Sequence, residues 1–156
     1  MIDDILIGPI ILPETMNSPR FLNFLETNFL DALLELPLAY RARMTLQLDG
    51  APAHFALLVR NHLNAHYSSW IGRGGTIAWP PRSPDLTSLD FFLWGTLKRR
   101  VYVNVPNTRK ELAEKIIQAA NELREDKAMI QRSTQHVALR ATACLQREGG
   151  HFEQFL

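Results

Sequence analysis

The sequence predicts an α/β fold, because short apolar segments rich in β-branched residues alternate with longer segments of helical periodicity. Size is the second observation. The 156 residues, 46% of them hydrophobic, suffice for one sizeable core, so we expect one domain. The third observation is the placement of two aspartates at the ends of structured segments, with Asp49 closing an apolar strand and Asp90 lying at the start of a helix.

The first half of the chain contains two expected strands and two expected helices. Residues 5–12 are apolar and interrupted by proline, which predicts a strand broken near Gly8 and Pro9. Ser18 and Pro19 supply an N-cap and a first-turn proline, so a helix is expected over residues 19–35. The other elements expected here are a buried strand over residues 44–48 and a helix over residues 54–65.

The second half is expected to be mostly helical. Residues 70–78 are expected to form a loop that enters a brief strand over residues 77–79, and a helix begins near Thr87 or Ser88. Thr108 and Glu111 have the spacing of a capping box, with an apolar stripe behind them. A last helix is expected over residues 127–148, ended by two glycines.

Charge is distributed unevenly along the chain. Residues 1–49 hold 3 basic and 7 acidic residues, whereas residues 50–156 hold 14 basic and 9 acidic residues. A basic second part fits a polyanionic partner such as DNA, although many proteins show a similar excess. The single Cys144 has no partner for a disulfide, and no stretch reaches roughly 18 uncharged apolar residues, so we expect a soluble intracellular protein without a membrane segment.

Several ordered motifs extend over nearly the whole chain. They are residues 7–13 (IGPIILP), 48–54 (LDGAPAH), 70–75 (WIGRGG), 79–94 (WPPRSPDLTSLDFFLW) and 149–153 (GGHFE). Together these motifs resemble those of mariner-type DDE/D transposases, a branch of the ribonuclease H-like superfamily that is abundant in insect genomes.

The resemblance implies a truncated ribonuclease H-like fold, a mixed sheet flanked by helices, with helices at the carboxy terminus. In that family three acidic residues bind the metal ions, and Asp49 matches the second and Asp90 the third. The first acid has no match, since Asp3 and Asp4 precede the wrong strand. We therefore expect residues 1–156 to be one partial catalytic domain, with the first catalytic strand and the amino-terminal DNA-binding domains lying upstream.

The implied chemistry is metal-dependent DNA cleavage and strand transfer in the nucleus. Two divalent ions activate the nucleophile and stabilise the leaving oxygen, and Mg²⁺ or Mn²⁺ takes oxygen ligands, so Asp49 and Asp90 are the expected catalytic and metal-binding residues. Simpler roles stay open. Asp49-Gly50 is also an ordinary turn, and Asp90 is also a helix-cap residue. Asp85 competes with Asp90 for the third place, but the resemblance implies that Asp85 structures the loop.

Six further residues are candidates for binding nucleic acid: His54, Arg73, Arg82, Lys98, Arg99 and Arg100. Each also has a structural interpretation. His54 is a polar helix start, Arg73 belongs to a tight glycine loop, and the three consecutive cations form a solvated helix end. The tryptophans are expected in the core, and a zinc site at His62 and His66 lacks further ligands.

Three functional hypotheses follow. The chain is a transposase-derived fragment that lacks one metal-binding acid and is therefore inactive, or a non-catalytic module retained to bind nucleic acid or protein, or a pseudogene product. The sequence leaves a homodimer open.

Overall fold

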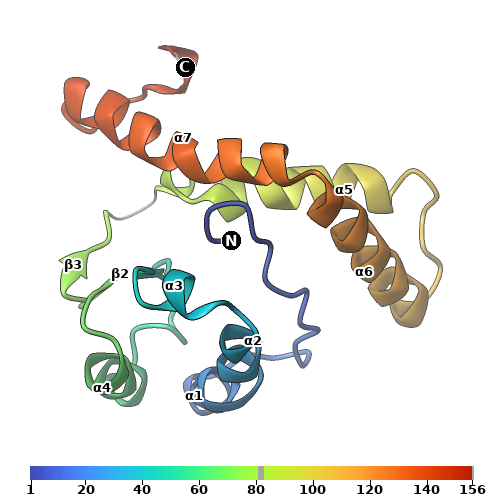
Figure 1. Cartoon of the computed structure of the whole chain (residues 1–156), viewed down its shortest axis with the longest axis horizontal. Coiled ribbons are helices and arrows are strands. Elements are labelled where there is room, and N and C mark those ends of the chain that lie inside the picture. Colours follow the sequence, from blue (N-terminus) through green and yellow to red (C-terminus); the bar gives the residue numbers. More distant parts are fainter. Residues whose placement is uncertain (81–82, 156) are drawn as a thin grey trace. The chain divides into compact units, whose positions relative to one another are not determined.

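The computed structural model describes residues 1–80 and 83–155 (Figure 1). The chain forms two compact units. The sheet unit comprises Ile10–Arg82, and the helical unit comprises Met1–Pro9 together with Ser83–Leu156. Each unit has its own cluster of buried hydrophobic side chains. The single domain expected from the sequence stays a prediction.

The sheet unit begins with a helical run that matches the helix expected over residues 19–35. It consists of α1 (Ser18–Phe24), a π-helical turn η1 (Leu25–Phe29) and α2 (Leu30–Leu34). The cap is Asn17 rather than Ser18, since the Asn17 side chain accepts a hydrogen bond of 3.0 Å from the Arg20 amide. A short helix α3 (Leu38–Arg41) follows, which the sequence did not predict.

A small parallel sheet forms the rest of this unit, so the α/β class is confirmed. Its strands are β1 (Leu46–Gln47), β2 (Trp70–Gly72) and β3 (Ile77–Ala78), in the order β1-β2-β3. Helix α4 (Leu57–His66) connects β1 to its parallel neighbour β2, as a crossover must. The strands expected over residues 44–48 and 77–79 are confirmed in shorter form, whereas β2 lies where a loop was expected.

Trp70 is the centre of the sheet unit's core. Only 1% of it is exposed, and it packs with Phe21, Leu25, Val59 and Leu63 from α1, η1 and α4. Its indole Nε1 donates a hydrogen bond of 2.9 Å to Asn64 Oδ1, so the polar atom of this buried ring is satisfied. The expectation of a core tryptophan is thus confirmed here, and it is wrong for Trp94, which is 53% exposed.

The helical unit contains three helices preceded by two irregular turns. They are the 3-10 turn η2 (Pro84–Leu86), the π-helical turn η3 (Leu89–Leu93), α5 (Trp94–Val101), α6 (Arg109–Glu125) and α7 (Lys127–Gln146); a further 3-10 turn, η4, spans Glu153–Phe155. None of the helices in residues 1–80 and 83–155 is long and apolar enough to span a membrane.

The caps of the long helices agree with the sequence. Thr108 Oγ1 accepts from the Glu111 amide at 3.1 Å, and Glu111 Oε2 accepts from the Asn107 amide at 2.8 Å, which confirms the capping box. Helix α7 ends two residues before the expected Glu148, and Gly149 then adopts a φ of 81°, a left-handed conformation that glycine reaches without strain.

The strand expected over residues 5–12 is wrong. Only an isolated antiparallel bridge between Ile2 and Ile5 forms at this end of the chain. Leu6 instead packs into the core of the helical unit, and the Arg124 guanidinium donates hydrogen bonds to the carbonyl oxygens of Leu6 and Gly8. Because an arginine satisfies these carbonyls and Pro9 has no N–H to donate, a strand ladder does not form.

Candidate functional site

Asp49 lies in a turn that directly follows the edge of the parallel sheet. The Leu48 amide still donates to the Ile71 carbonyl at 2.8 Å, so the sheet pairing continues up to the residue before Asp49. Asp49 Oδ1 then accepts a hydrogen bond of 3.0 Å from the Ala51 amide, which closes the turn. The carboxylate is 52% exposed, so solvent and ligands reach it.

His54 packs beside this carboxylate. Its Nδ1 is buried and lies 2.6 Å from Asp49 Oδ1, but it has no hydrogen-bond partner among the described residues. The imidazole also lies against the Phe21 ring, with 4.3 Å between ring centroids. The geometry therefore makes His54 a close neighbour of the Asp49 carboxylate, and a direct role of His54 toward nucleic acid stays a prediction.

Asp90 lies on an exposed position of the π-helical turn η3. Its amide donates to the Thr87 carbonyl at 2.9 Å, which starts the helical hydrogen bonding that α5 continues. π-helical turns are rare in proteins, and those that occur are often found at functional sites. Ser88, the residue that caps η3, makes no side-chain capping hydrogen bond.

Arg140 from α7 ties the segment around Asp90 together. Its guanidinium donates to the Asp85 carbonyl at 3.0 Å and to Glu153 Oε1 at 2.9 Å, and it lies 4.1 Å from the centroid of the Phe91 ring. The side chain is only 14% exposed. The sequence interpretation missed Arg140, although a cation within the apolar stripe of the last helix, between Val137 and Ala141, was a usable signal.

Arg73 lies in a loop whose shape its glycines determine. The Arg73 guanidinium stacks on the Phe55 ring at 4.0 Å. A Cβ on Gly72 would lie 2.4 Å from the Trp70 ring, and Gly74 has a φ of 76°, so the backbone here tolerates little but glycine. This geometry supports the tight-loop interpretation, and a DNA contact by Arg73 stays a prediction.

The three consecutive cations at the end of α5 differ from one another. Arg100 lies 3.7 Å from Glu122 and donates to the Ala119 carbonyl at 3.4 Å, so it links α5 to α6. Lys98 and Arg99 are exposed. Arg82, another candidate for binding nucleic acid, lies outside the described residues.

His62 and His66 stack on each other on α4, with 4.2 Å between ring centroids. His62 Nδ1 also lies 3.4 Å from Glu26 Oε1. Burial lowers the pKa of His62, and the neighbouring His66 lowers it further, which outweighs the opposite effect of Glu26.

The aspartate oxygens are suitable ligands for a divalent cation, but too few ligating residues are grouped together in the described part of the chain. Aspartate oxygens are the ligands that Mg²⁺ and Mn²⁺ prefer. Within residues 1–80 and 83–155, however, no group of three or more His, Cys, Asp or Glu residues is arranged to hold a metal ion. Asp49 and Asp90 belong to different units, so the convergence of their carboxylates stays a prediction.

The order of the helices and strands defines the fold. A parallel sheet with crossover helix α4, followed by helices α5 to α7, is the ribonuclease H-like architecture that the motifs predict. The comparison with solved structures bears this out. The catalytic domain of Mos1 mariner transposase matches with a TM-score of 0.73 and 22% identity, over 90% of this chain and 66% of that one.

Two further structures of the same domain match. The Mos1 transposase catalytic domain with raltegravir and Mn gives a TM-score of 0.75 at 22% identity, and the one with raltegravir and Mg gives 0.70 at 23%. Both matches cover 90% of this chain and 67% of the other chain. The chain thus spans about two thirds of their length. No family model and no curated protein sequence matches.

Proposed function

We propose that this chain is a transposase-derived catalytic domain of the DDE/D type, whose ancestral activity is metal-dependent cleavage and joining of DNA in the nucleus. The observation that carries the proposal is the placement of Asp49. It directly follows the edge of a parallel sheet, in a fold shared with a transposase catalytic domain. Its half-exposed carboxylate accepts a hydrogen bond from the Ala51 amide and lies 2.6 Å from His54 Nδ1. The motif around Asp90 supplies a second exposed carboxylate.

In this proposal Asp49 and Asp90 are two of the ligands for Mg²⁺ or Mn²⁺, and DNA is the partner. A two-ion site polarises the attacked phosphate and activates the nucleophile. The residues of this chain would hold the carboxylates in place: His54 against Asp49, and Arg140 against the segment that carries Asp90.

We further propose that these 156 residues do not cut DNA by themselves. The motif matches identify two of the three acids that the chemistry uses, Asp49 and Asp90. Losing one ligand from such a site removes several kcal/mol of barrier lowering. No strand cleavage or joining is expected with Mg²⁺ or Mn²⁺, whichever DNA ends are offered.

Binding of Mn²⁺ by the purified chain, followed through the electron paramagnetic resonance signal of free Mn²⁺, tests the proposal. We expect weak binding that both Asp49→Asn and Asp90→Asn reduce. Asp85→Asn is the matched control, because it removes a nearby carboxylate that the motif interpretation places outside the metal site, and it leaves the Asp85 carbonyl that Arg140 contacts. Equal losses in the control, or an unchanged affinity in Asp90→Asn, would refute the metal assignment.

A second candidate function is a non-catalytic module that binds nucleic acid. The exposed Lys98 and Arg99 favour it, because cations at a protein surface attract phosphates. The two functions separate experimentally, since this one requires DNA binding without any metal.

A further inference from the structure

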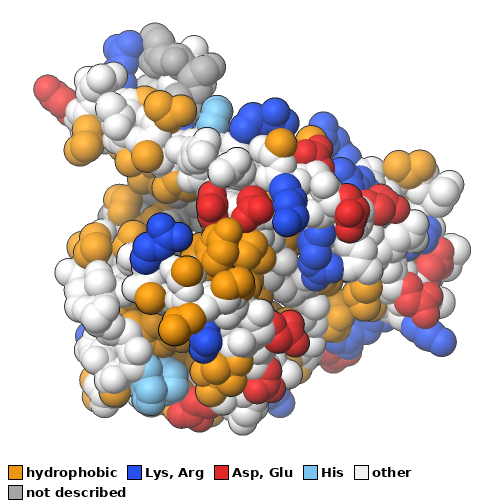
Figure 2. All heavy atoms as spheres, viewed as in Figure 1, with side chains coloured by type: hydrophobic (Ala, Val, Ile, Leu, Met, Phe, Trp, Pro, Cys, Tyr) orange, Lys and Arg blue, Asp and Glu red, His pale blue; other side chains and the backbone are white. Residues whose placement is uncertain are grey.

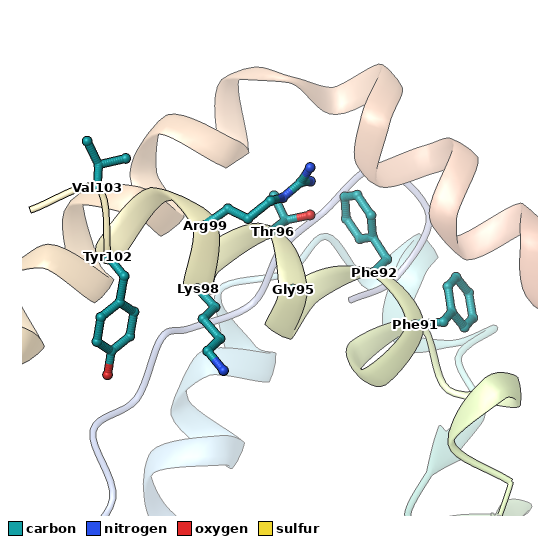
Figure 3. Close-up of a pocket in the computed structure, with 8 residues that line it drawn as sticks. All are labelled: Phe91, Phe92, Gly95, Thr96, Lys98, Arg99, Tyr102 and Val103. Carbon is teal, nitrogen blue, oxygen red and sulfur yellow. The ribbon is translucent and has the colours of Figure 1, made fainter. Parts of the chain in front are cut away.

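A groove of about 660 Å³ runs along the surface of the helical unit, over η3 and α5 (Figure 3). Its lining is entirely local in sequence: Phe91, Phe92, Gly95, Thr96, Lys98, Arg99, Tyr102 and Val103. The groove begins at the residue after Asp90. It is comparable in size to clefts that take small ligands, roughly 300–1,000 Å³.

Gly95 lies in the middle of the groove's lining. Residues at helical spacing place Phe91, Lys98 and Tyr102 on one side of Gly95, and the other lining residues on its other side. Figure 3 shows Lys98 and Tyr102 extending to one side of the helix, and Phe92 to the other. Since Gly95 has no side chain, the helix backbone is the floor between these walls. A Cβ added at Gly95 would meet no atom within 4 Å.

The charge of the groove is positive. Lys98 and Arg99 are exposed, and among the described residues neither forms an ion pair, unlike their neighbour Arg100. No Asp or Glu is among the lining residues. By contrast, basic and acidic side chains are interspersed over α6 and α7 on the face shown in Figure 2. The groove therefore combines two unneutralised cations with a close approach to backbone.

Aromatic and apolar side chains form the ends of the groove. Tyr102 is 48% exposed and Val103 is 76% exposed at the end of α5. Phe91 and Phe92 form the other end, where Arg140 fixes the Phe91 ring. Cations interleaved with accessible rings are the composition that binds unpaired nucleic acid, because bases stack on the rings while phosphates contact the cations.

We propose that this groove binds an unpaired DNA strand, with Lys98 and Arg99 contacting phosphates beside Gly95 and a base lying against Tyr102. Duplex DNA fits less well, because its bases are stacked on each other and cannot lie against the Tyr102 ring. The choice of DNA rests on the proposed function. The recognition itself requires no metal.

The test is fluorescence anisotropy with a labelled oligothymidylate, titrated with the full chain in EDTA at several salt concentrations. Lys98→Ala with Arg99→Ala should weaken binding and reduce the slope of log affinity against log salt by about 1.4, since each phosphate contact on a single strand contributes about 0.7. Lys110→Ala with Arg132→Ala removes the same charge from exposed positions on α6 and α7, and it should leave the slope unchanged.

Gly95 provides the sharper variants. Gly95→Gln fills the groove without adding charge, and Gly95→Glu fills it with an anion; both residues are good helix formers, so α5 should stay folded, which circular dichroism checks. We expect Gly95→Gln to weaken binding and Gly95→Glu to weaken it more. Duplex DNA of the same length should compete poorly.

Three results would overturn the proposal: wild-type affinity in Gly95→Gln, an equal loss in the Lys110 and Arg132 control, or tighter binding of duplex than of single strand. Because all measurements are made in EDTA, they do not depend on the metal ligands. If Asp49→Asn loses Mn²⁺ binding but still binds the oligothymidylate, both proposals are upheld. If the wild-type chain binds Mn²⁺ but does not bind the oligothymidylate, only the groove proposal is refuted.

Discussion

The two candidate carboxylates are held in opposite ways. Asp49 is fixed by its own neighbours, with Ala51 and His54 lying at most five residues further along the chain. The segment around Asp90 is fixed from a distance, because Arg140 reaches it from α7, 50 residues later. The position of Asp49 therefore depends on a local turn and should survive a change elsewhere in the chain. The position of Asp90 depends on the packing of the last helix.

The largest effect should come from Arg140→Met. The substitution removes two hydrogen bonds and the contact with the Phe91 ring, although it also removes a buried Nε that has no hydrogen-bond partner. We expect a loss of about 2–3 kcal/mol in the free energy of unfolding. Urea denaturation measures it, and Arg132→Met on the exposed side of α7 should cost less than about 0.5 kcal/mol. Equal costs would remove the distinction between local and distant support.

Gly72→Ala should have the next largest effect. An added Cβ would lie 2.4 Å from the Trp70 ring, so the core around β2 must shift, at a cost of about 1–3 kcal/mol. Gly50→Ala is the matched control, since a Cβ there meets nothing within 4 Å and lies next to Asp49. Thermal unfolding of the two variants compares them, and a larger drop in Tm for Gly50→Ala would contradict the structure.

Asp49→Ala should have a smaller effect on stability. It removes the hydrogen bond from the Ala51 amide and the contact with His54, and the carboxylate itself is 52% exposed, so we expect about 0.5–1.5 kcal/mol. Asp49→Asn keeps an acceptor oxygen and should recover most of that loss. If Asn and Ala destabilise the chain equally in urea, the turn does not depend on this hydrogen bond.

The smallest effect is a pH dependence in the sheet unit. Because burial lowers the pKa of His62 in the folded chain below its ordinary value of 6.5, the unfolded chain binds more protons between these two values. The contribution of neutral His62 to the free energy of unfolding is therefore complete above pH 6.5. It is lost as the pH falls through the lowered pKa of His62 in the folded chain. His62→Gln should flatten this part of the curve of unfolding free energy against pH, and a steeper curve would contradict the sign.

Features that depend on neighbouring residues were predictable from the sequence. The run of helix over α1 to α2, the Thr108 capping box and the glycines after α7 all follow from local spacing. Asp49 was located because its turn signal lies next to an apolar strand. Local chemistry decided each of these elements.

Features set by distant contacts were not predictable. Residues 5–12 have the composition of a strand, but Arg124 takes their carbonyls. β2 is only three residues long and ends in glycine, so its pairing depends on β1 and on the buried Trp70. Arg140 contacts residues that are distant in the sequence, and it belongs to none of the motifs. The groove over Gly95 likewise appears only once α5 places its side chains.

The central proposal is that Asp49 and Asp90 bind the same divalent ion. Replacing the ion by Fe²⁺ and adding ascorbate and peroxide produces radicals that cut the backbone beside the metal, and mass spectrometry locates the cuts. The account predicts cuts near both residue 49 and residue 90, and both should disappear in Asp49→Asn as well as in Asp90→Asn. Cuts at one position alone, or cuts that each variant abolishes only at its own position, would contradict it.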